Sequence, residues 1–566
     1  MIKKEHLSRL LVACLACIVF AGWLSHESKA FKIDYLGEVQ KNIIYFGKVY
    51  QEVTNKYIDV VDPHKLMNIG IDAMLTAVDD YTILIEGEEN TQLKILTTGR
   101  YGGLGMVIGV RDHWPTVMEP PYDDTPAARA GCREGDRIVR VDGVSTEDMT
   151  VNEVAELMRG EIGTAVNIEV SRSGVDEPLE FRLVRAEIIV KDVVFSDLIA
   201  DSVGYIKLSR FSKNATAEMR QAVIGLKNKG MTGGIIIDLR NNPGGLLEAA
   251  VGVADIFLPK GEFIVSTQGR TPETVQRYFS ENAPLLPNQN LVLLVNSFSA
   301  SASEIVAGAI QDLDRGVIVG QPTYGKGLVQ SIIEINRDAQ LKLTTAKYYL
   351  PSGRLIQKDR RTRKEKEKVL LSTDNAVDRI PDSLKVFSTA IGREVHGRGG
   401  VVPDITVVVD SLNSFQKSLL RQSMIFNYAV NFANTHTQTE ETSLVTPGMI
   451  EDFKAYLEKH KFSYESESQN EFEDFVTVLK KEGKFYNLEP QITAIQAVLN
   501  QSFHDTFSQN REFIKKQLEL ELATKQGGSS AKIRAGFKND RALKAALKLI
   551  QNVPEFTALL QPDDKI

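Results

Sequence analysis

The strongest constraint on the fold is a stretch from Ile188 to Val409 in which short apolar strands alternate with helices. Ile235–Leu239 and Leu291–Asn296 are almost uninterrupted apolar runs, which is typical of strands covered on both faces. Between such runs, Met219–Leu226 has apolar residues three and four positions apart, which predicts one buried face of a helix. This alternation predicts a layered α/β domain with a largely parallel sheet.

The remaining sequence indicates further structural units, because 566 residues are too many for one hydrophobic core. Glycine-poor sequence with helical spacing occurs near both ends, and a segment of short strands, turns and one helix lies directly before the α/β region. We therefore predict a multidomain α+β protein. Its expected segments are a signal peptide (residues 1–30), an N-terminal helical cap (31–98), a small domain of short strands (99–187), the α/β core (188–410) and a C-terminal helical region (411–566).

The first 30 residues have the pattern of an export signal. Lys3, Lys4 and Arg9 precede the apolar run Leu10–Leu24, and Ser28–Ala30 offers the small residues that a signal peptidase requires. The apolar run is short for a membrane span, and an uncleaved N-terminal membrane anchor stays open as the alternative to cleavage. The sequence therefore predicts an exported protein in the periplasm, either soluble or anchored at its N-terminus.

Composition argues against several classes of function. The chain is 43% hydrophobic and 25% charged, as is usual for a globular protein, and its net charge of -7 gives no reason to expect nucleic acid as a partner. No Walker loop indicates a nucleotide site. The eight histidines are scattered, and Cys132 is the only cysteine beyond the predicted signal peptide. Neither a metal site nor a cofactor is predicted.

A serine-rich turn carries the most informative chemistry. The segment Asn296–Ile305 reads Asn-Ser-Phe-Ser-Ala-Ser-Ala-Ser-Glu-Ile and lies where a buried strand passes into a helix. A serine at such a turn is exposed at the edge of the sheet, and the helix N-terminus favours negative charge nearby. A hydroxyl becomes a nucleophile only when a base takes its proton.

Two residue types could supply that base. No histidine lies close to Ser301 in the sequence, so His396 is the best candidate for a Ser–His–Asp triad, which stays open as an alternative. Lys326 lies between two glycines, which would let the backbone wrap around the amine. Lowering a lysine pKa from about 10.4 by about three units requires roughly 4 kcal/mol of destabilisation of the ammonium form. Gln330, four residues later, would share a face with Lys326 in an extended segment and could orient the amine.

Residues 99–187 resemble a PDZ domain. The resemblance rests on Gly-Gly-Leu-Gly within Tyr101–Met106, on Pro-Ala-Ala-Arg-Ala-Gly at residues 126–131, on Gly-Asp-Arg-Ile at 135–138 and on Val-Asp-Gly at 141–143. In PDZ domains a glycine-rich loop binds a peptide carboxylate, and the peptide adds as a strand to the sheet. The resemblance assigns the carboxylate-binding amides to Leu104, Gly105 and Met106. It also makes Arg159 a candidate for coupling between ligand binding and the active site.

Several motifs of the α/β region resemble those of the carboxyl-terminal processing peptidases, also called tail-specific proteases. They are the serine-rich run, Thr-Tyr-Gly-Lys-Gly-Leu-Val-Gln at residues 323–330, Asp-Leu-Arg-Asn-Asn-Pro-Gly-Gly-Leu-Leu at 238–247, Tyr-Tyr-Leu-Pro-Ser-Gly-Arg at 348–354, Gly-Arg at 392–393 and Gly-Gly-Val-Val-Pro-Asp at 399–404. The resemblance covers residues 35–410 and implies a crotonase-like layered core.

The same resemblance implies the roles of five residues. Ser301 would be the nucleophile and Lys326 the base, with Gln330 orienting the lysine. The backbone amides of Gly245 and Ala302 would form the oxyanion hole, where two preorganised donors stabilise a developing negative charge. This set implies a serine endopeptidase that works through an acyl-enzyme and needs no cofactor.

The predicted function is therefore hydrolysis of peptide bonds in proteins or peptides with free C-termini, which the PDZ domain recognises by their tails. An adaptor protein stays open as a further partner. Two other classes also stay open. An acyl-CoA hydratase or isomerase would share the crotonase-like core but would use a glutamate base, and an inactive protease-like scaffold would only bind tails.

Overall fold

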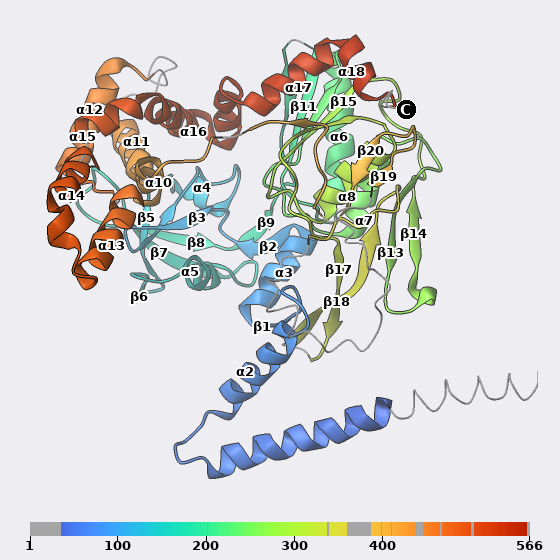
Figure 1. Cartoon of the computed structure of the whole chain (residues 1–566), viewed down its shortest axis with the longest axis horizontal. Helices are drawn as coiled ribbons and strands as arrows, with labels where there is room; N and C mark the ends of the chain where they lie inside the picture. Colours follow the sequence, from blue (N-terminus) through green and yellow to red (C-terminus); the bar gives the residue numbers. More distant parts are fainter. Residues whose placement is uncertain are drawn as a thin grey trace, which may run out of the picture. The chain divides into compact units, whose positions relative to one another are not determined.

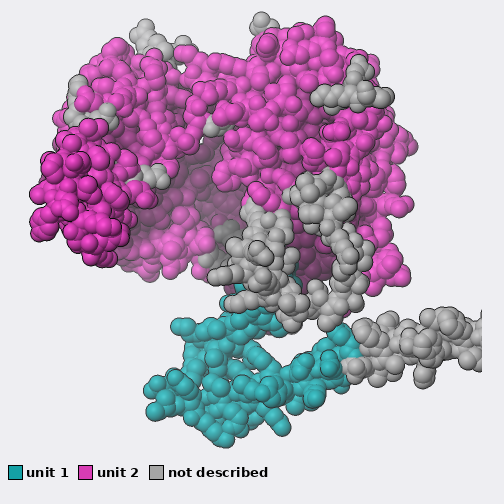
Figure 2. Space-filling model, in the orientation of Figure 1, with its two compact units in different colours: residues 1–84 teal, residues 85–566 magenta. Residues whose placement is uncertain are grey.

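The computed structural model describes residues 35–200, 202–336, 339–358, 386–397, 399–408, 410–436, 445–464, 467–499 and 503–562. The predicted signal peptide lies outside the described residues. The chain divides into two compact units, residues 1–84 and residues 85–566 (Figure 2). Figure 1 labels the helices and strands along the chain.

The first unit is helical in its described part. A helix over residues 35–56 precedes α2 (Pro63–Thr76). The carboxylate of Asp62 caps α2 by accepting two amides of its first turn, and proline fits the first helical position because its missing N–H is not needed there. Strand β1 (Ile83–Glu86), which was not predicted, and helix α3 (Glu88–Thr98) follow.

An antiparallel sheet and two helices form the region that resembles a PDZ domain. The sheet order is β3 (Ile108–Arg111), β4 (Trp114–Val117), β5 (Arg137–Val141), β7 (Ala165–Ser171) and β8 (Leu179–Val184), with β6 (Val144–Ser145) beside β5. The helices are α4 (Pro126–Ala130) and α5 (Val151–Met158), and a separate ribbon pairs β2 (Arg100–Gly103) with β9 (Ala186–Ile189). Thr150 and Glu153 form a capping box that starts α5 where the sequence predicted a helix.

A six-stranded sheet forms the centre of the second unit. Its order is β10 (Val193–Ile199), β11 (Val203–Leu208), β12 (Ile235–Asp238), β15 (Leu291–Val295), β16 (Val317–Gly320) and β21 (Ile405–Thr406). β10 is antiparallel to β11, and all the other neighbouring pairs are parallel. The predicted layered α/β core is therefore confirmed. Its parallel strands bring their carboxyl ends to one edge of the sheet.

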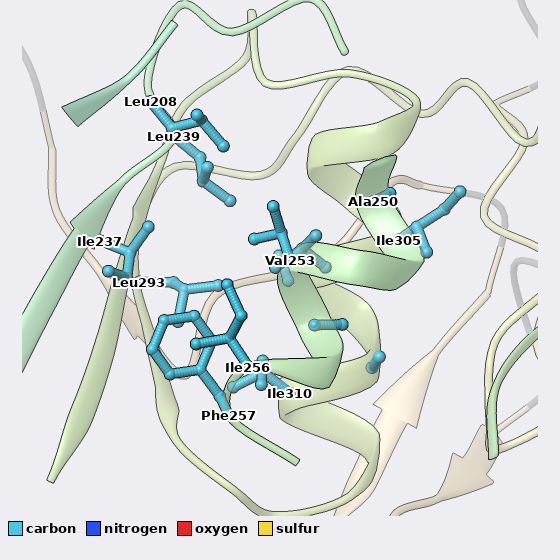
Figure 3. Packing of buried hydrophobic residues seen from close by; sticks show 14 of the residues in the cluster. Leu208, Ile237, Leu239, Ala250, Val253, Ile256, Phe257, Leu293, Ile305 and Ile310 are labelled. Carbon is cyan, nitrogen blue, oxygen red and sulfur yellow. The ribbon is translucent and has the colours of Figure 1, made fainter. Parts of the chain in front are cut away.

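Three helices cover one face of this sheet: α6 (Ala215–Asn228), α7 (Leu247–Asp255) and α8 (Ala302–Asp312). Figure 3 shows how side chains from these helices meet the strands, with Val253 of α7, Ile310 of α8 and Leu293 of β15 in one buried cluster. All three side chains are at most 1% exposed. The packing fixes the start of α8 at the carboxyl edge of the sheet.

Two C-terminal helices cover the opposite face. α17 (Arg541–Gln551) and α18 (Val553–Leu559) contribute Leu543, Leu549 and Phe556 to a buried cluster with Ile236 and Leu294 of the sheet. The sequence assigned these helices to a C-terminal region without a role. The structure makes them the third layer of the core.

A second sheet carries the segment after the Gly-Lys-Gly motif. It contains the antiparallel neighbours β17 (Leu328–Glu334), β18 (Ala339–Tyr349), β13 (Phe263–Gln268) and β14 (Gln276–Phe279), with a short 3-10 helix η1 (Pro272–Thr274) between the last two. Further along the chain, β19 (Val386–Ser388) pairs with β20 (Glu394–His396).

The other C-terminal helices form a cluster of their own. They are α10 (Ser414–Arg421), α11 (Met424–Thr435), α12 (Pro447–Lys459), α13 (Glu467–Lys481), α14 (Phe485–Leu499), α15 (Phe503–Gln509) and α16 (Arg511–Phe537). α16 is interrupted at Gly527 and Gly528, whose backbone angles are not helical. Before the break, Lys525 forms a buried ion pair with Glu134 of the PDZ-like region. Within the described ranges, no helix combines the length and apolar character that a membrane span needs.

Candidate active site

Ser301 occupies the turn between β15 and α8, at the carboxyl edge of the parallel sheet. It is the N-cap of α8 and has φ 55° and ψ −112°, a region that residues other than glycine rarely adopt. The flanking serines differ from it because both are fully buried. The Ser299 hydroxyl donates to the carbonyl of Leu239 at 2.8 Å, and the Ser303 hydroxyl donates to that of Asn242 at 2.9 Å. Only the half-buried Ser301 is therefore available to solvent among the three.

The buried carboxylate of Glu304 joins this turn to the Gly-Lys-Gly loop. One oxygen, Oε2, accepts the amide of Ser301 at 2.8 Å and the amide of Lys326 at 2.9 Å. The other oxygen accepts the Gly325 amide at 2.7 Å and the Thr323 hydroxyl at 2.5 Å. Burial raises the pKa of Glu304 to about 7, against these hydrogen bonds, which favour the ionised form. Sequence reasoning missed this role, although a glutamate three residues after an N-cap serine is the spacing of a capping box.

The hydroxyl of Tyr348 lies beside the same two residues. Tyr348 is on β18 and 1% exposed. Its hydroxyl is 3.2 Å from the carbonyl oxygen of Ser301 and also hydrogen-bonds with the carbonyl of Lys326. Its backbone amide donates to the carbonyl of Gly327 at 3.0 Å. The tyrosine thus contacts both segments that carry the predicted dyad.

Lys326 lies in the loop directly before β17 and is half-buried. The glycines on either side are needed for close contact with the backbone of a following segment. Gly325 has φ 84°, and a Cβ built on it would lie 2.7 Å from the Cβ of Lys358; on Gly327 it would lie 2.8 Å from the backbone nitrogen of Gln357. A larger residue at either position would push this loop away from its neighbours.

Gln330 lies on β17, as predicted, but Lys326 does not belong to the strand. That the two share a face of one extended segment therefore stays a prediction. The pairing with β18 has a bulge between Val329 and Gln330, where the extra residue, Thr345, lies on β18. The side-chain amide nitrogen of Gln330 is 3.4 Å from the Thr344 hydroxyl.

The predicted oxyanion-hole residues lie in two turns that touch. A Cβ built on Gly244 would lie 2.9 Å from both the Ala302 nitrogen and the Ser301 Cβ, so only glycine allows this approach. Gly245 forms a bridge with Phe211, where a Cβ would lie 2.2 Å from the Phe211 carbonyl oxygen. Among the described residues, neither the Gly245 amide nor the Ala302 amide donates a hydrogen bond to another group.

Ion pairs stabilise the turn that carries these glycines. Arg240 donates to both carboxylate oxygens of Asp238 and to both oxygens of Asp540, the N-cap of α17, over 2.7–2.9 Å. Burial alone would raise the pKa of Asp238, but Arg240 and Lys207 hold it below its usual range. Asp540, which lies in the C-terminal helical region, thus contacts Arg240 at the carboxyl edge of the core sheet.

The predicted carboxylate-binding loop links β2 to β3. Gly105 has φ 82° and a Cβ there would lie 2.4 Å from Thr125, which excludes other residues. In the described part of the chain, the amides of Leu104, Gly105 and Met106 donate to no other group. Three free amides in one loop are the arrangement that a carboxylate requires.

Arg159 is the C-cap of α5, and its guanidinium lies over the ring of Tyr101 at 5.4 Å. Its buried Nη1 has no hydrogen-bond partner among the described residues. Burial raises the pKa of Tyr101 to about 12. Arg159 therefore lies next to the strand that leads into the carboxylate-binding loop, which is where a coupling role would require it.

The alternative base, His396, is exposed at the end of β20. Its backbone carbonyl accepts a hydrogen bond from Arg354 at 3.1 Å. Its ring makes no hydrogen bond with Ser301 in the described residues. Cys132 is buried, and burial raises the pKa of its thiol to about 11, so it is a poor nucleophile.

Comparison with known families identifies three parts of the chain. Residues 202–363 match peptidase family S41, residues 118–172 match the PDZ domain, and residues 415–550 match the C-terminal helical domain described for a probable PDZ-protease. The sequence prediction of a PDZ domain attached to a protease core is therefore confirmed.

Curated relatives are carboxy-terminal processing proteases. The chain is 39% identical over 320 residues to that of Bartonella bacilliformis, covering 56% of this chain and 73% of the relative. It is 38% identical over 296 residues to that of a Synechocystis species, covering 51% of this chain and 68% of the relative. Among solved structures, the photosystem II D1 C-terminal processing protease is 26% identical with a TM-score of 0.34, over 63% of this chain and 85% of that one. The chain belongs to the carboxy-terminal processing proteases of peptidase family S41, a family of serine peptidases.

Proposed function

We propose that this protein is an exported endopeptidase that binds the C-terminal tails of proteins through its PDZ domain and cleaves peptide bonds with a Ser301–Lys326 dyad. The observation that carries the proposal is the Glu304 carboxylate, whose single oxygen Oε2 accepts the amides of both residues. The half-buried Ser301 and a lysine in a tight glycine loop therefore share one hydrogen-bonding partner, which supports a common role.

The proposed reaction begins with proton transfer. The neutral amine of Lys326 takes the proton of the Ser301 hydroxyl while Oγ attacks the carbonyl carbon of the peptide bond. The amides of Gly245 and Ala302 would donate to the oxyanion of the tetrahedral intermediate, and the nearby helix N-terminus would favour its charge. Gln330 would orient the amine.

Collapse of this intermediate completes the first half of the reaction. The C–N bond breaks, Lys326 returns its proton to the leaving amine, and an ester to Ser301 remains. Water then gives a proton to Lys326 and attacks the ester. The second collapse releases the new carboxyl terminus and returns the proton to Ser301. No redox step or cofactor is involved.

Substrate capture would occur away from this site. A free carboxylate would accept hydrogen bonds from Leu104, Gly105 and Met106, and the tail would add beside β3, next to α5. The pattern of residues 1–30 supports export to the periplasm, with cleavage or an N-terminal anchor as the two modes. An adaptor protein that presents substrates is also proposed, but no surface of this chain is assigned to bind it.

Cleavage of a protein with an apolar, free C-terminus tests the proposed chemistry. Ser301→Ala and Lys326→Ala should each lower kcat to the background of the assay. Ser299→Ala and Ser303→Ala are matched controls because they remove buried hydroxyls of the same turn, and they should retain most of the activity. Full activity of Ser301→Ala would exclude the dyad, and loss on His396→Ala would favour the triad.

A further inference from the structure

Both the amides and the carbonyls of the two residues of the proposed dyad contact buried side chains. On one side, Glu304 accepts the amides of Ser301 and Lys326. On the other side, the Tyr348 hydroxyl reaches the carbonyl oxygens of the same two residues. One acceptor group on α8 and one donor group on β18 thus contact the backbone of the same two residues, the first at their amides and the second at their carbonyls.

The position of Tyr348 is fixed independently of these bonds. Its backbone pairs with Thr267 of β13 and donates to Gly327. Its ring belongs to the main buried cluster of the core. A side chain held by a sheet and a close-packed core can set the distance between two loops, because it has little freedom to follow either of them.

The hydroxyl distinguishes this residue from an ordinary core aromatic. The ring would pack equally well as phenylalanine, which has no polar atom to bury. Burying a hydroxyl is unfavourable unless it is hydrogen-bonded. The Ser301 carbonyl already accepts the amides of Glu304 and Ile305, at 2.8 Å and 3.0 Å, as expected at a helix start. The hydroxyl is therefore not required to begin the helix, and its position between the two carbonyls indicates another use.

We propose that Tyr348 is a positioning residue of the hydrolytic reaction: its hydroxyl holds the carbonyls of Ser301 and Lys326 and so sets the separation of nucleophile and base. This inference rests on the proposed Ser301–Lys326 dyad. Tyr348 does not touch the substrate and exchanges no proton with it. Its effect is on the geometry in which proton transfer occurs.

The test compares Tyr348→Phe with Tyr278→Phe in the full chain. Tyr278 lies in the same sheet, on β14, two strands away from β18, and its hydroxyl bonds with Gln276 at 2.8 Å. Small errors in the placement of reacting groups cost up to about a hundredfold in rate. We expect Tyr348→Phe to lower kcat by about tenfold to a hundredfold with little change in KM, and Tyr278→Phe to change neither.

The pH profile separates positioning from a general structural role. A lysine that moves out of its site becomes better solvated, so the apparent pKa governing kcat/KM should move upward in Tyr348→Phe. A profile and kcat like those of Tyr278→Phe would overturn the inference. The inference would also be overturned if Tyr348→Phe lost kcat together with a lower Tm while its pH profile stayed unchanged.

Further variants keep the result interpretable. If Tyr348→Phe does not fold, 3-fluorotyrosine at position 348 keeps the ring and hydroxyl but makes the phenol more acidic. Because the positioning hydroxyl is kept, kcat and the pH profile should stay close to those of the wild type, and a profile that shifts with the more acidic phenol would overturn the inference. Ser301→Ala and Lys326→Ala are measured in the same assay. If they retain activity, the proposed function fails; if they lose it and Tyr348→Phe does not, only the present inference fails.

Discussion

At the scale of single residues, the Glu304 carboxylate lies in a fully buried position where four donors surround it. Each oxygen accepts two of them, so both must be unprotonated for all four bonds to form. A carboxylate is the only side chain that offers two acceptor oxygens in this geometry. This residue therefore orders two turns that are far apart in the sequence.

Glu304→Gln tests that arrangement with almost no change in volume. The amide keeps one acceptor oxygen, but its NH₂ group faces two N–H donors in one orientation, and the Gly325 N–H and the Thr323 hydroxyl in the other. Buried donors left without an acceptor cost about 1–3 kcal/mol. We expect a loss of stability of that order in denaturant unfolding and at least about a tenfold lower kcat. Wild-type kcat in a folded variant would show that the dyad does not depend on Glu304.

The pKa of Glu304, raised to about 7, adds a pH dependence with a defined sign. An ordinary glutamate has a pKa of about 4.3, so between these values the folded chain holds a proton that the unfolded chain has lost. The contribution of Glu304 to stability therefore falls as pH rises through this window. Activity should follow the opposite trend, because ionised Glu304 and neutral Lys326 are both required. The free energy of unfolding and kcat/KM are both measured against pH. In Glu304→Gln, the part of each pH dependence that comes from titration of Glu304 should be absent.

At the scale of elements, apolar patterns predicted most of the core. Runs such as Ile235–Leu239 and Leu291–Asn296 are strands because they are covered on both faces, and the single helix expected between the short strands of the PDZ-like region is present as α5. What covers the second face could not be predicted. The amphipathic spacing of α17 shows that one side is buried but not against which surface.

The residues of the candidate site also fall into those that the sequence indicated and those that it did not. Motifs and resemblance indicated Ser301, Lys326 and the glycine turns, which carry their own signatures in the sequence. Glu304 and Tyr348 act through contacts with backbone groups, and such contacts depend on how α8 and β18 are packed. The face-sharing argument for Gln330 stays a prediction, because Lys326 precedes the strand within which the two-residue alternation holds.

The ion pair between α17 and the glycine turn gives a prediction at this scale. Asp540→Asn keeps an N-cap acceptor for the Leu543 amide but removes the charge that faces Arg240. We expect a loss of about 1–3 kcal/mol in the free energy of unfolding. The control Asp410→Asn removes a pair with Arg541 in which both side chains are more than half exposed, and should change stability by less than about 0.5 kcal/mol. Equal effects of the two variants would contradict a specific role of Asp540.

At the scale of the whole molecule, the PDZ-like region and the protease core each offer unused backbone amides. The loop Leu104–Met106 presents three of them and the turns at Gly245 and Ala302 present two. Both sets are suited to negative oxygen, one on a carboxylate and the other on a transient oxyanion. The proposed function therefore uses different parts of the chain for substrate binding and for cleavage.

Amidation of the substrate terminus tests this division. It removes the charge and one acceptor oxygen, and should weaken capture by roughly 1.5–3 kcal/mol, the usual range for hydrogen bonds to a charged group. The loss should appear in KM if the PDZ domain only tethers the substrate, and in kcat as well if its occupancy also assembles the active site. The measurement is cleavage of one substrate with a free and an amidated C-terminus. Equal rates on both would remove tail recognition from the proposed function.

The third layer of the core has a consequence for biosynthesis. Ile236 and Leu294 are buried under α17 and α18, which a ribosome makes long after the strands themselves. Until those helices have been made, one face of the sheet is uncovered and Arg240 has Asp238 but not Asp540 as a partner. A nascent chain at that stage exposes an apolar surface that chaperones recognise. The core is therefore complete only when α17 and α18, which follow Ser301 and Lys326 by a long stretch of chain, have packed onto the sheet.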